Sequence, residues 1–104
     1  MEHLIDFEAL EWTSALPGAR AKIFEGNGKK FRLVEFSEEL EEPDWCLKGH
    51  LGYILEGTLR IDFSGAVETF SAGQGFCIPP GPEHKHMASV PSGVVRLVLV
   101  EDAD

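Results

Sequence analysis

Turn-forming residues recur at short intervals along this chain of 104 residues, and the segments between them are rich in Val, Ile, Leu and Phe. Asn27 and Gly28 lie between AKIF and FRLVEF, and they favour a tight hairpin because both residues tolerate a positive φ. Ser64 and Gly65 separate TLRIDF from AVETF in the same way, and the turn VPSG precedes the apolar run VVRLVLV. Short strands joined by such turns predict an all-β sandwich or barrel.

The sequence leaves little room for helices. No segment after residue 20 keeps a helical period for three turns, and Pro43 would interrupt a helix in the charged stretch FSEELEEPDW. Residues 5–12 could form one short helical turn. We therefore expect under about a fifth of the residues to be helical, well below the usual share in globular proteins.

Length and charge limit what the chain can be. A chain of 104 residues supports a single hydrophobic core, so we expect one domain over residues 1–104, with a barrel over about 21–100. The formal net charge of −9 argues against nucleic acid, whose phosphates need a basic surface, and against anionic membranes. No apolar run approaches the roughly 20 residues of a membrane-spanning helix.

The N-terminal stretch MEHLIDFEALEW contains four acids and no lysine or arginine, which is unlike a signal peptide. Two cysteines do not make a disulfide framework, so we expect a cytoplasmic protein with reduced thiols. The same stretch is apolar enough that residues 1–20 should pack on the barrel or on a partner's barrel. Because a small barrel has open sheet edges, which proteins cover or pair, we expect a homodimer.

The stretch GQGFCIPPGPEHKH contains the most specific pattern in the chain. Five residues separate Gly73 from Pro79, one separates Pro79 from Gly81, and two separate Gly81 from His84. This pattern, G-x5-P-x-G-x2-H, resembles the second conserved motif of the cupin superfamily. The asparagine that ordinarily ends that motif is replaced by Ala88.

The stretch PDWCLKGHLGYILEG resembles the first cupin motif, H-x-H-x3-E-x6-G, with its ligands exchanged. When Gly57 is taken as the final glycine, the glutamate position falls on His50. The two histidine positions then fall on Cys46 and Asp44. The resemblance covers about residues 20–100 and implies a cupin-type double-stranded β-helix, which is an all-β jelly-roll barrel.

The resemblance also implies a metal site inside the barrel, with Cys46, His50, His84 and His86 as ligands and Asp44 as the alternative to His86. Side chains two apart on a strand share a face, so Asp44 and Cys46 should point inward together, and so should His84 and His86. Thiolate, imidazole and carboxylate ligands suit zinc or, with open positions, iron. The expected cofactor is a divalent ion of zinc, iron, nickel or manganese.

Each of these residues also has a simpler interpretation. Cys46 can be a small buried hydrophobic residue, and His50 can be hydrogen-bonded in the barrel wall. His86 can lie at the mouth of the pocket and act as an acid or base, since its ordinary pKa is near 6.5. Asp44 can belong to a solvated acidic rim, and Cys77 is expected in the core.

Two functions are compatible with this sequence. In the first, the protein is a metalloenzyme, such as an isomerase, lyase or dioxygenase, in which the metal polarises a substrate oxygen and His86 or Asp44 moves protons. In the second, it is a binding or sensing module that holds a small molecule without a functional metal. Fold similarity alone does not choose between them, and the spacing assigns no catalytic residue.

Overall fold

A computed structural model of the chain describes residues 3–103. Within these residues the chain forms nine β-strands and two single-turn 3-10 helices, η1 and η2. In chain order they are η1 (Phe7–Ala9), β1 (Thr13–Leu16), β2 (Ala19–Gly26), β3 (Lys29–Ser37), β4 (His50–Glu56), β5 (Thr58–Asp62), β6 (Val67–Ser71), β7 (Gly75–Ile78), η2 (Pro82–His84), β8 (Met87–Ser89) and β9 (Val94–Asp102).

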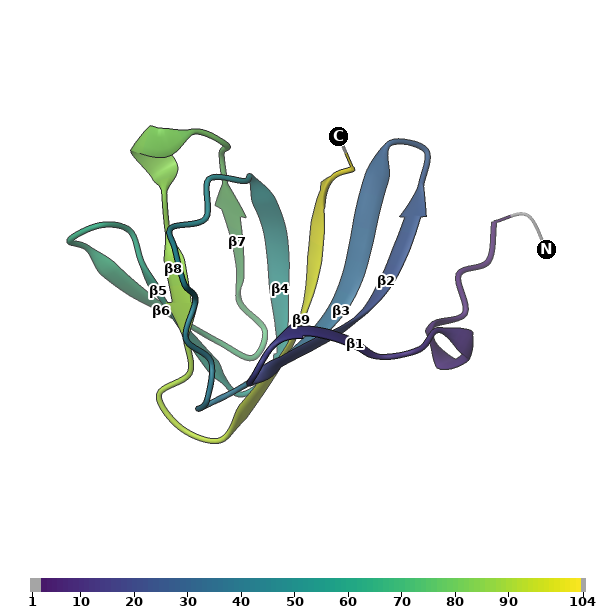
Figure 1. Cartoon of the computed structure of the whole chain (residues 1–104), viewed down its shortest axis with the longest axis horizontal. Helices are drawn as coiled ribbons and strands as arrows, with labels where there is room; N and C mark the ends of the chain where they lie inside the picture. The colour runs from purple at the N-terminus through teal and green to yellow at the C-terminus, as the bar shows by residue number, and fades with distance from the viewer. Residues whose placement is uncertain (1–2, 104) are drawn as a thin grey trace.

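The strands form two antiparallel sheets that face one another (Figure 1). The larger sheet has the strand order β1-β2-β3-β9-β4-β7, and the smaller has the order β6-β5-β8. The last long strand, β9, therefore lies between β3 and β4, although far from both in sequence. The β2–β3 turn, the C-terminal end of β9 and η2 all lie at the upper end of the view in Figure 1. The jelly-roll barrel implied by the cupin resemblance is confirmed, and it already begins at β1, before residue 21.

The predicted hairpins form where the turn residues indicated them. Asn27 and Gly28 adopt φ values of 51° and 75° between β2 and β3. Ser64 and Gly65 adopt 66° and 116° between β5 and β6, where the Asp62 carboxylate accepts hydrogen bonds from both backbone N–H groups. Few residues tolerate this left-handed region, so these pairs fix the register of both hairpins.

The core lies between the two sheets and is built from alternate residues of their strands. Val95, Leu97 and Leu99 of β9 face inward and are at most 6% exposed. Ile54 of β4 and Leu59 of β5 complete the centre of this cluster. Burial of such side chains contributes about 1.5–3 kcal/mol each to stability. Because inward positions repeat every second residue, the same alternation carries Glu101 at the end of β9 into the interior.

The N-terminal segment packs on the outer face of its own barrel. The Phe7 ring meets the Phe31 ring edge-on, with centroids 5.1 Å apart. The Lys22 ammonium donates a hydrogen bond to the Phe7 carbonyl oxygen at 2.8 Å, and the Arg20 guanidinium lies over the Trp12 ring. The expected helical turn near residues 5–12 is confined to η1.

The strand register corrects the expectation for Cys77. Cys77, which we expected in the core, is exposed, because it lies opposite the half-exposed Leu51 on the outer face of the larger sheet. Among the described residues, no helix is long and apolar enough to cross a membrane.

Candidate metal centre and adjoining pocket

Three potential metal ligands converge inside the barrel: Cys46, His50 and His86. Each offers one donor atom, and the three donor atoms lie within 4.8 Å of one another. His50 is the first residue of β4, whereas Cys46 and His86 lie outside the strands and pair with each other in an isolated β-bridge. The Cys46 N–H donates to the His86 carbonyl at 2.8 Å, and the His86 N–H donates to the Cys46 carbonyl at 3.1 Å. The backbone therefore fixes the spacing of two of the three donors.

The orientation of the His86 ring is set by its own neighbourhood. Its Nδ1 atom lies 3.0 Å from the carbonyl oxygen of His84, and a carbonyl oxygen only accepts hydrogen bonds. Nδ1 therefore carries the proton, and Nε2 keeps a free lone pair. His86 is only 4% exposed and lines the cavity, so this lone pair is available to a group bound there.

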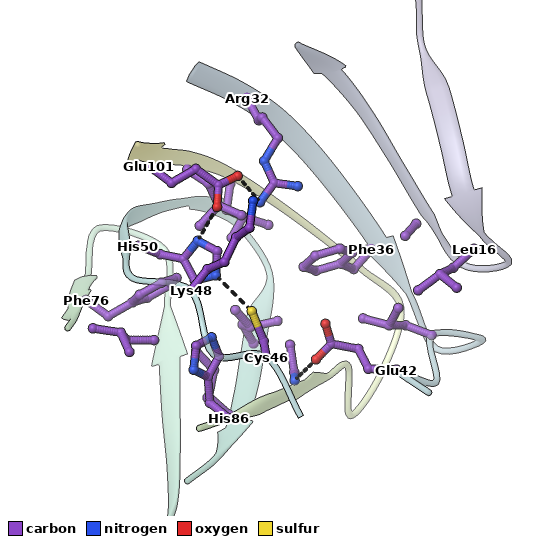
Figure 2. A pocket seen from close by; sticks show the side chains of 18 of the residues that line it. Leu16, Arg32, Phe36, Glu42, Cys46, Lys48, His50, Phe76, His86 and Glu101 are labelled. Atoms are coloured by element: carbon purple, nitrogen blue, oxygen red, sulfur yellow. Dashed lines mark hydrogen bonds and ion pairs between the residues drawn. The ribbon is translucent and has the colours of Figure 1, made fainter. Parts of the chain in front are cut away.

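The His50 ring lies between a thiol and a carboxylate. Its Nε2 atom is 3.4 Å from the Cys46 Sγ, and its Nδ1 atom is 3.2 Å from the Glu101 Oε2 (Figure 2). The second contact is short enough for an ion pair, but its angles fall outside hydrogen-bond geometry, and both atoms lack another partner within the described chain. We interpret it as a weak, poorly aligned contact that could tighten when Nε2 is engaged.

His50 and Cys46 are both uncharged at neutral pH in the absence of a cation. Burial lowers the pKa of His50 to about 4, against the opposing pull of the Glu101 carboxylate. Burial likewise raises the pKa of the Cys46 thiol, and the nearby Glu42 and Glu101 carboxylates add to this effect. A neutral imidazole is the form that binds a metal, whereas the thiol must lose its proton on binding.

Glu101 is held in place from its other side. Its Oε1 atom lies 3.0 Å from a terminal nitrogen of Arg32, and the Glu101 side chain is only 4% exposed. A carboxylate beside the non-ligating nitrogen of a histidine is the usual support of a histidine ligand, because it orients the ring and raises its basicity. Arg32, Glu101 and His50 thus form a chain of contacts that ends at the donor atoms (Figure 2).

The three donors fit a divalent transition metal. Zinc binds sulfur at about 2.3 Å and imidazole nitrogen at about 2.0–2.1 Å, which places tetrahedral donor atoms about 3.5 Å apart. The Cys46–His50 distance of 3.4 Å is already in this range. Three protein ligands would leave at least one coordination position open toward the pocket, as in catalytic rather than structural zinc sites.

The structure does not bring His84 and Asp44 to this group. His84 ends η2, and this tight turn breaks the alternation that would have placed His84 and His86 on one face. The His84 side chain lines a separate surface cavity with Phe70 and Glu83, and only its carbonyl oxygen touches the site. Asp44 is exposed in a loop, where its carboxylate accepts a hydrogen bond from the Trp45 N–H.

A cavity of about 320 Å³ adjoins the three donors. Three cationic side chains line it, those of Lys30, Arg32 and Lys48. Apolar side chains line another part of its wall, including Leu16 and Phe36, which lie across the pocket from His50 and Lys48 in Figure 2. The cavity is large enough for a small organic molecule.

Glu42 is a further polar group of the cavity wall. Its Oε2 atom accepts a hydrogen bond from the Ala88 N–H at 2.6 Å. Burial raises the pKa of this carboxyl above its ordinary value, although the Ala88 N–H and His86 oppose the shift. A carboxyl of this kind can hold or give up a proton near a bound molecule.

Sequence reasoning identified Cys46, His50 and His86 but missed Glu42, Glu101 and Arg32. Glu42 stands in an acidic run that looks like solvated surface. Glu101 belongs to the C-terminal EDAD, where only the inward alternation of VVRLVLVE could have indicated burial.

Solved cupin structures are similar to this chain in fold. An RmlC-like cupin from Shewanella frigidimarina aligns over 100% of this chain and 95% of its own, at 19% identity and a TM-score of 0.76. The polyketide cyclase RemF from Streptomyces resistomycificus aligns over 100% of this chain and 81% of its own, at 18% identity and a TM-score of 0.80. A cupin-2 domain containing protein, also from S. frigidimarina, aligns over 79% of this chain and 78% of its own, at 24% identity and a TM-score of 0.66.

These likenesses establish the class of protein: the chain is a small protein with the cupin fold, as the spacing from Gly73 to His84 predicted. No protein-family model matches the sequence, and no curated protein is significantly similar to it. The particular role of the chain must therefore be argued from its own site.

Proposed function

We propose that this protein is a metal-binding cupin that holds a small molecule beside a divalent ion bound by Cys46, His50 and His86. The observation that carries the proposal is the convergence of these three donor atoms within 4.8 Å. The His84 carbonyl orients the His86 ring through Nδ1, and the Glu101 carboxylate lies 3.2 Å from His50 Nδ1. Zinc or iron suits this donor set best.

The surroundings of the site favour a catalytic role for the metal. A bound divalent ion would supply a Lewis acid for a carbonyl or enol oxygen. The chain itself supplies the Glu42 carboxyl, which lies on the cavity wall and can move a proton. This combination suits an isomerase or lyase, and it assigns to Glu42 the proton transfer that sequence reasoning gave to His86 or Asp44.

A metal-free binding module is the second candidate, and one observation favours it. The Cys46 thiol and His50 Nε2 can form a hydrogen bond with each other at 3.4 Å, and the raised pKa of the thiol keeps its proton available. In that case the histidines would bind an organic ligand directly.

Metal analysis of untagged protein separates the two candidates. We expect about one equivalent of zinc or iron in the wild type, and loss of the metal in the variants Cys46→Ala and His86→Ala. His84→Ala is the matched control, because its side chain lies outside the group and it should retain the metal. Loading with Co²⁺ should add a thiolate charge-transfer band in the near ultraviolet that Cys46→Ala lacks.

The same experiment can overturn the proposal. Wild-type protein that takes up no zinc, iron, nickel or manganese at micromolar concentration would establish the metal-free candidate. Loss of metal from His84→Ala but not from His86→Ala would instead restore the ligand assignment implied by the cupin motif. Circular dichroism of each variant distinguishes loss of a ligand from loss of the fold.

We further propose that the protein is a homodimer that pairs through the outer face of the larger sheet. On this face the cross-strand neighbours are apolar: Leu51 lies opposite Val100, and Tyr53 opposite Val98. Leu51 and Tyr53 are 55% and 48% exposed. Contiguous apolar surface of this kind on a soluble protein marks an interaction site.

A further inference from the structure

We propose that the pocket takes a small carboxylic acid with an apolar tail, and that Lys48 and Arg32 receive the carboxylate. This inference deepens the proposed function and rests on it for the position of the ligand beside the metal. It is carried by the separation of charge and apolar surface along the cavity wall, which the following contacts describe.

Positive charge gathers at the cavity although the protein is strongly acidic. The chain has 9 lysine and arginine residues against 18 aspartate and glutamate residues. Three of these few cations, Lys30, Arg32 and Lys48, line this one cavity. Cations gathered around a cavity attract a small anion even when the net charge of the protein is negative.

The anionic groups in the cavity do not neutralise these cations fully. Two carboxyl groups, those of Glu42 and Glu101, line the cavity beside its three cationic side chains. Glu101 pairs with Arg32, whereas Lys30 makes only a long contact of 3.6 Å with the exposed Glu25. Within residues 3–103, Lys48 has no acidic partner within 4.0 Å. The Nε atom of Arg32 is buried and has no hydrogen-bond partner in the same part of the chain. The Arg32 side chain is 24% exposed and lines the cavity, and a guanidinium pairs well with a carboxylate.

The apolar part of the wall defines the other end of the ligand. Leu16 of β1, Phe36 of β3 and Leu40 line the cavity, and in Figure 2 Leu16 and Phe36 lie across it from Lys48 and Arg32. Leu40 is 5% exposed, and Phe36 packs against the core. Binding against this wall is favourable because it removes apolar ligand surface from water. A short acid such as acetate has almost no apolar surface to bury.

Binding of four simple probes to zinc-loaded protein tests this inference. The probes are 3-phenylpropanoate, acetate, 3-phenylpropan-1-ol and 3-phenylpropylamine, with affinities measured by calorimetry or by NMR titration. We expect 3-phenylpropanoate to bind most tightly, at least about tenfold above acetate and the alcohol, because only it uses both ends of the pocket. The amine should bind most weakly.

Single-residue variants test the cationic end and the apolar end of the pocket separately. Lys48→Ala should weaken 3-phenylpropanoate about tenfold and leave the alcohol unchanged, and Lys48→Arg should restore most of the loss. Lys85→Ala is the matched control, since it removes the same charge but Lys85 lies over the Trp45 ring outside the cavity. Leu16→Ala should weaken 3-phenylpropanoate but not acetate. Added salt should weaken the acids and not the alcohol.

The outcomes separate this inference from the proposed function. If the protein takes up metal normally but binds the amine as well as the acid, or if Lys48→Ala changes nothing, the inference is wrong and the metal site stands. If the protein takes up no metal, the titrations are run on metal-free protein, where Lys48 and the apolar wall are unchanged. Selective binding of the acid then upholds the inference alone, and no binding overturns both.

Discussion

The Nδ1 atom of His50 lies 3.2 Å from the Oε2 atom of Glu101, although 50 residues lie between them in the chain. The two residues are neighbours because β9 runs beside β4 in the larger sheet. Glu101 is thus a positioning residue for the proposed ligand His50. Such groups contribute to metal affinity without touching the metal.

Glu101→Gln should weaken zinc binding by about 10- to 100-fold, because the amide carries no charge to support the His50 ring. The affinity can be measured by competition with a chelator. Glu83→Gln is the matched control, since Glu83 is an exposed residue of η2 outside the donor group. Unchanged affinity in Glu101→Gln would show that the contact with His50 has no role in metal binding.

The stability of the metal-free protein should decrease as the pH is lowered from about 6.5 to about 4. Burial lowers the pKa of His50 from 6.5 to about 4, so over this interval the unfolded chain binds a proton that the folded chain does not. The contribution of the neutral His50 ring to the free energy of unfolding is complete above pH 6.5. It is lost as the pH falls through about 4. Urea unfolding with a chelator present measures it, and His50→Asn should flatten the dependence. A wild-type profile that rises toward pH 4 would contradict this prediction.

Gly57→Ala should destabilise the barrel by more than about 2 kcal/mol, since strain and steric overlap add. Gly57 has a φ of 85°, and a Cβ atom there would lie 2.4 Å from the Val94 carbonyl oxygen. Gly65 is the control: its φ is 116°, but a Cβ atom there meets nothing within 4 Å. Thermal or urea unfolding of both variants should therefore give the larger loss for Gly57→Ala. Equal losses of stability in the two variants would mean that backbone strain, and not steric overlap with Val94, accounts for the effect.

Tyr53→Glu should dissociate the proposed dimer, because it places a charge among the apolar side chains of β4 and β9 on the outer face of the larger sheet. Sedimentation at tens of micromolar should give a dimer for the wild type and a monomer for the variant. Val67→Glu is the control, since Val67 is 56% exposed but lies on β6 in the smaller sheet. A monomeric wild type would remove this prediction together with the dimer.

The fold was predictable because its signals are local. Asn27 and Gly28 determine a hairpin through their own backbone preferences, whatever the rest of the chain does. The alternation of apolar residues in β9 likewise indicates its inward face. Strand order was not predictable in this way, because the pairing of β9 with β3 and β4 depends on contacts distant in sequence.

Strand alternation indicates the inward direction of only one of the three donors. His50 begins β4, and its inward direction follows from the buried Ile54 four residues later. His84 was misplaced because Gly81, with a φ of 121°, leads into the η2 turn instead of an extended strand. The alternation along β9 indicates burial of Glu101, but its partners Arg32 and His50 are brought to it by other strands of the sheet.

The β-bridge between Cys46 and His86 ties the long connection from β3 to β4 to the residues just before β8. The two residues thus join a loop to the smaller sheet through a single pair of backbone hydrogen bonds. A metal ion bound by both side chains would connect the same two segments a second time, in addition to the backbone hydrogen bonds. Amide hydrogen exchange at Cys46 and His86 should then slow on metal loading far more than exchange in the β2–β3 hairpin. The bound metal would therefore stabilise the position of the loop as well as take part in the site.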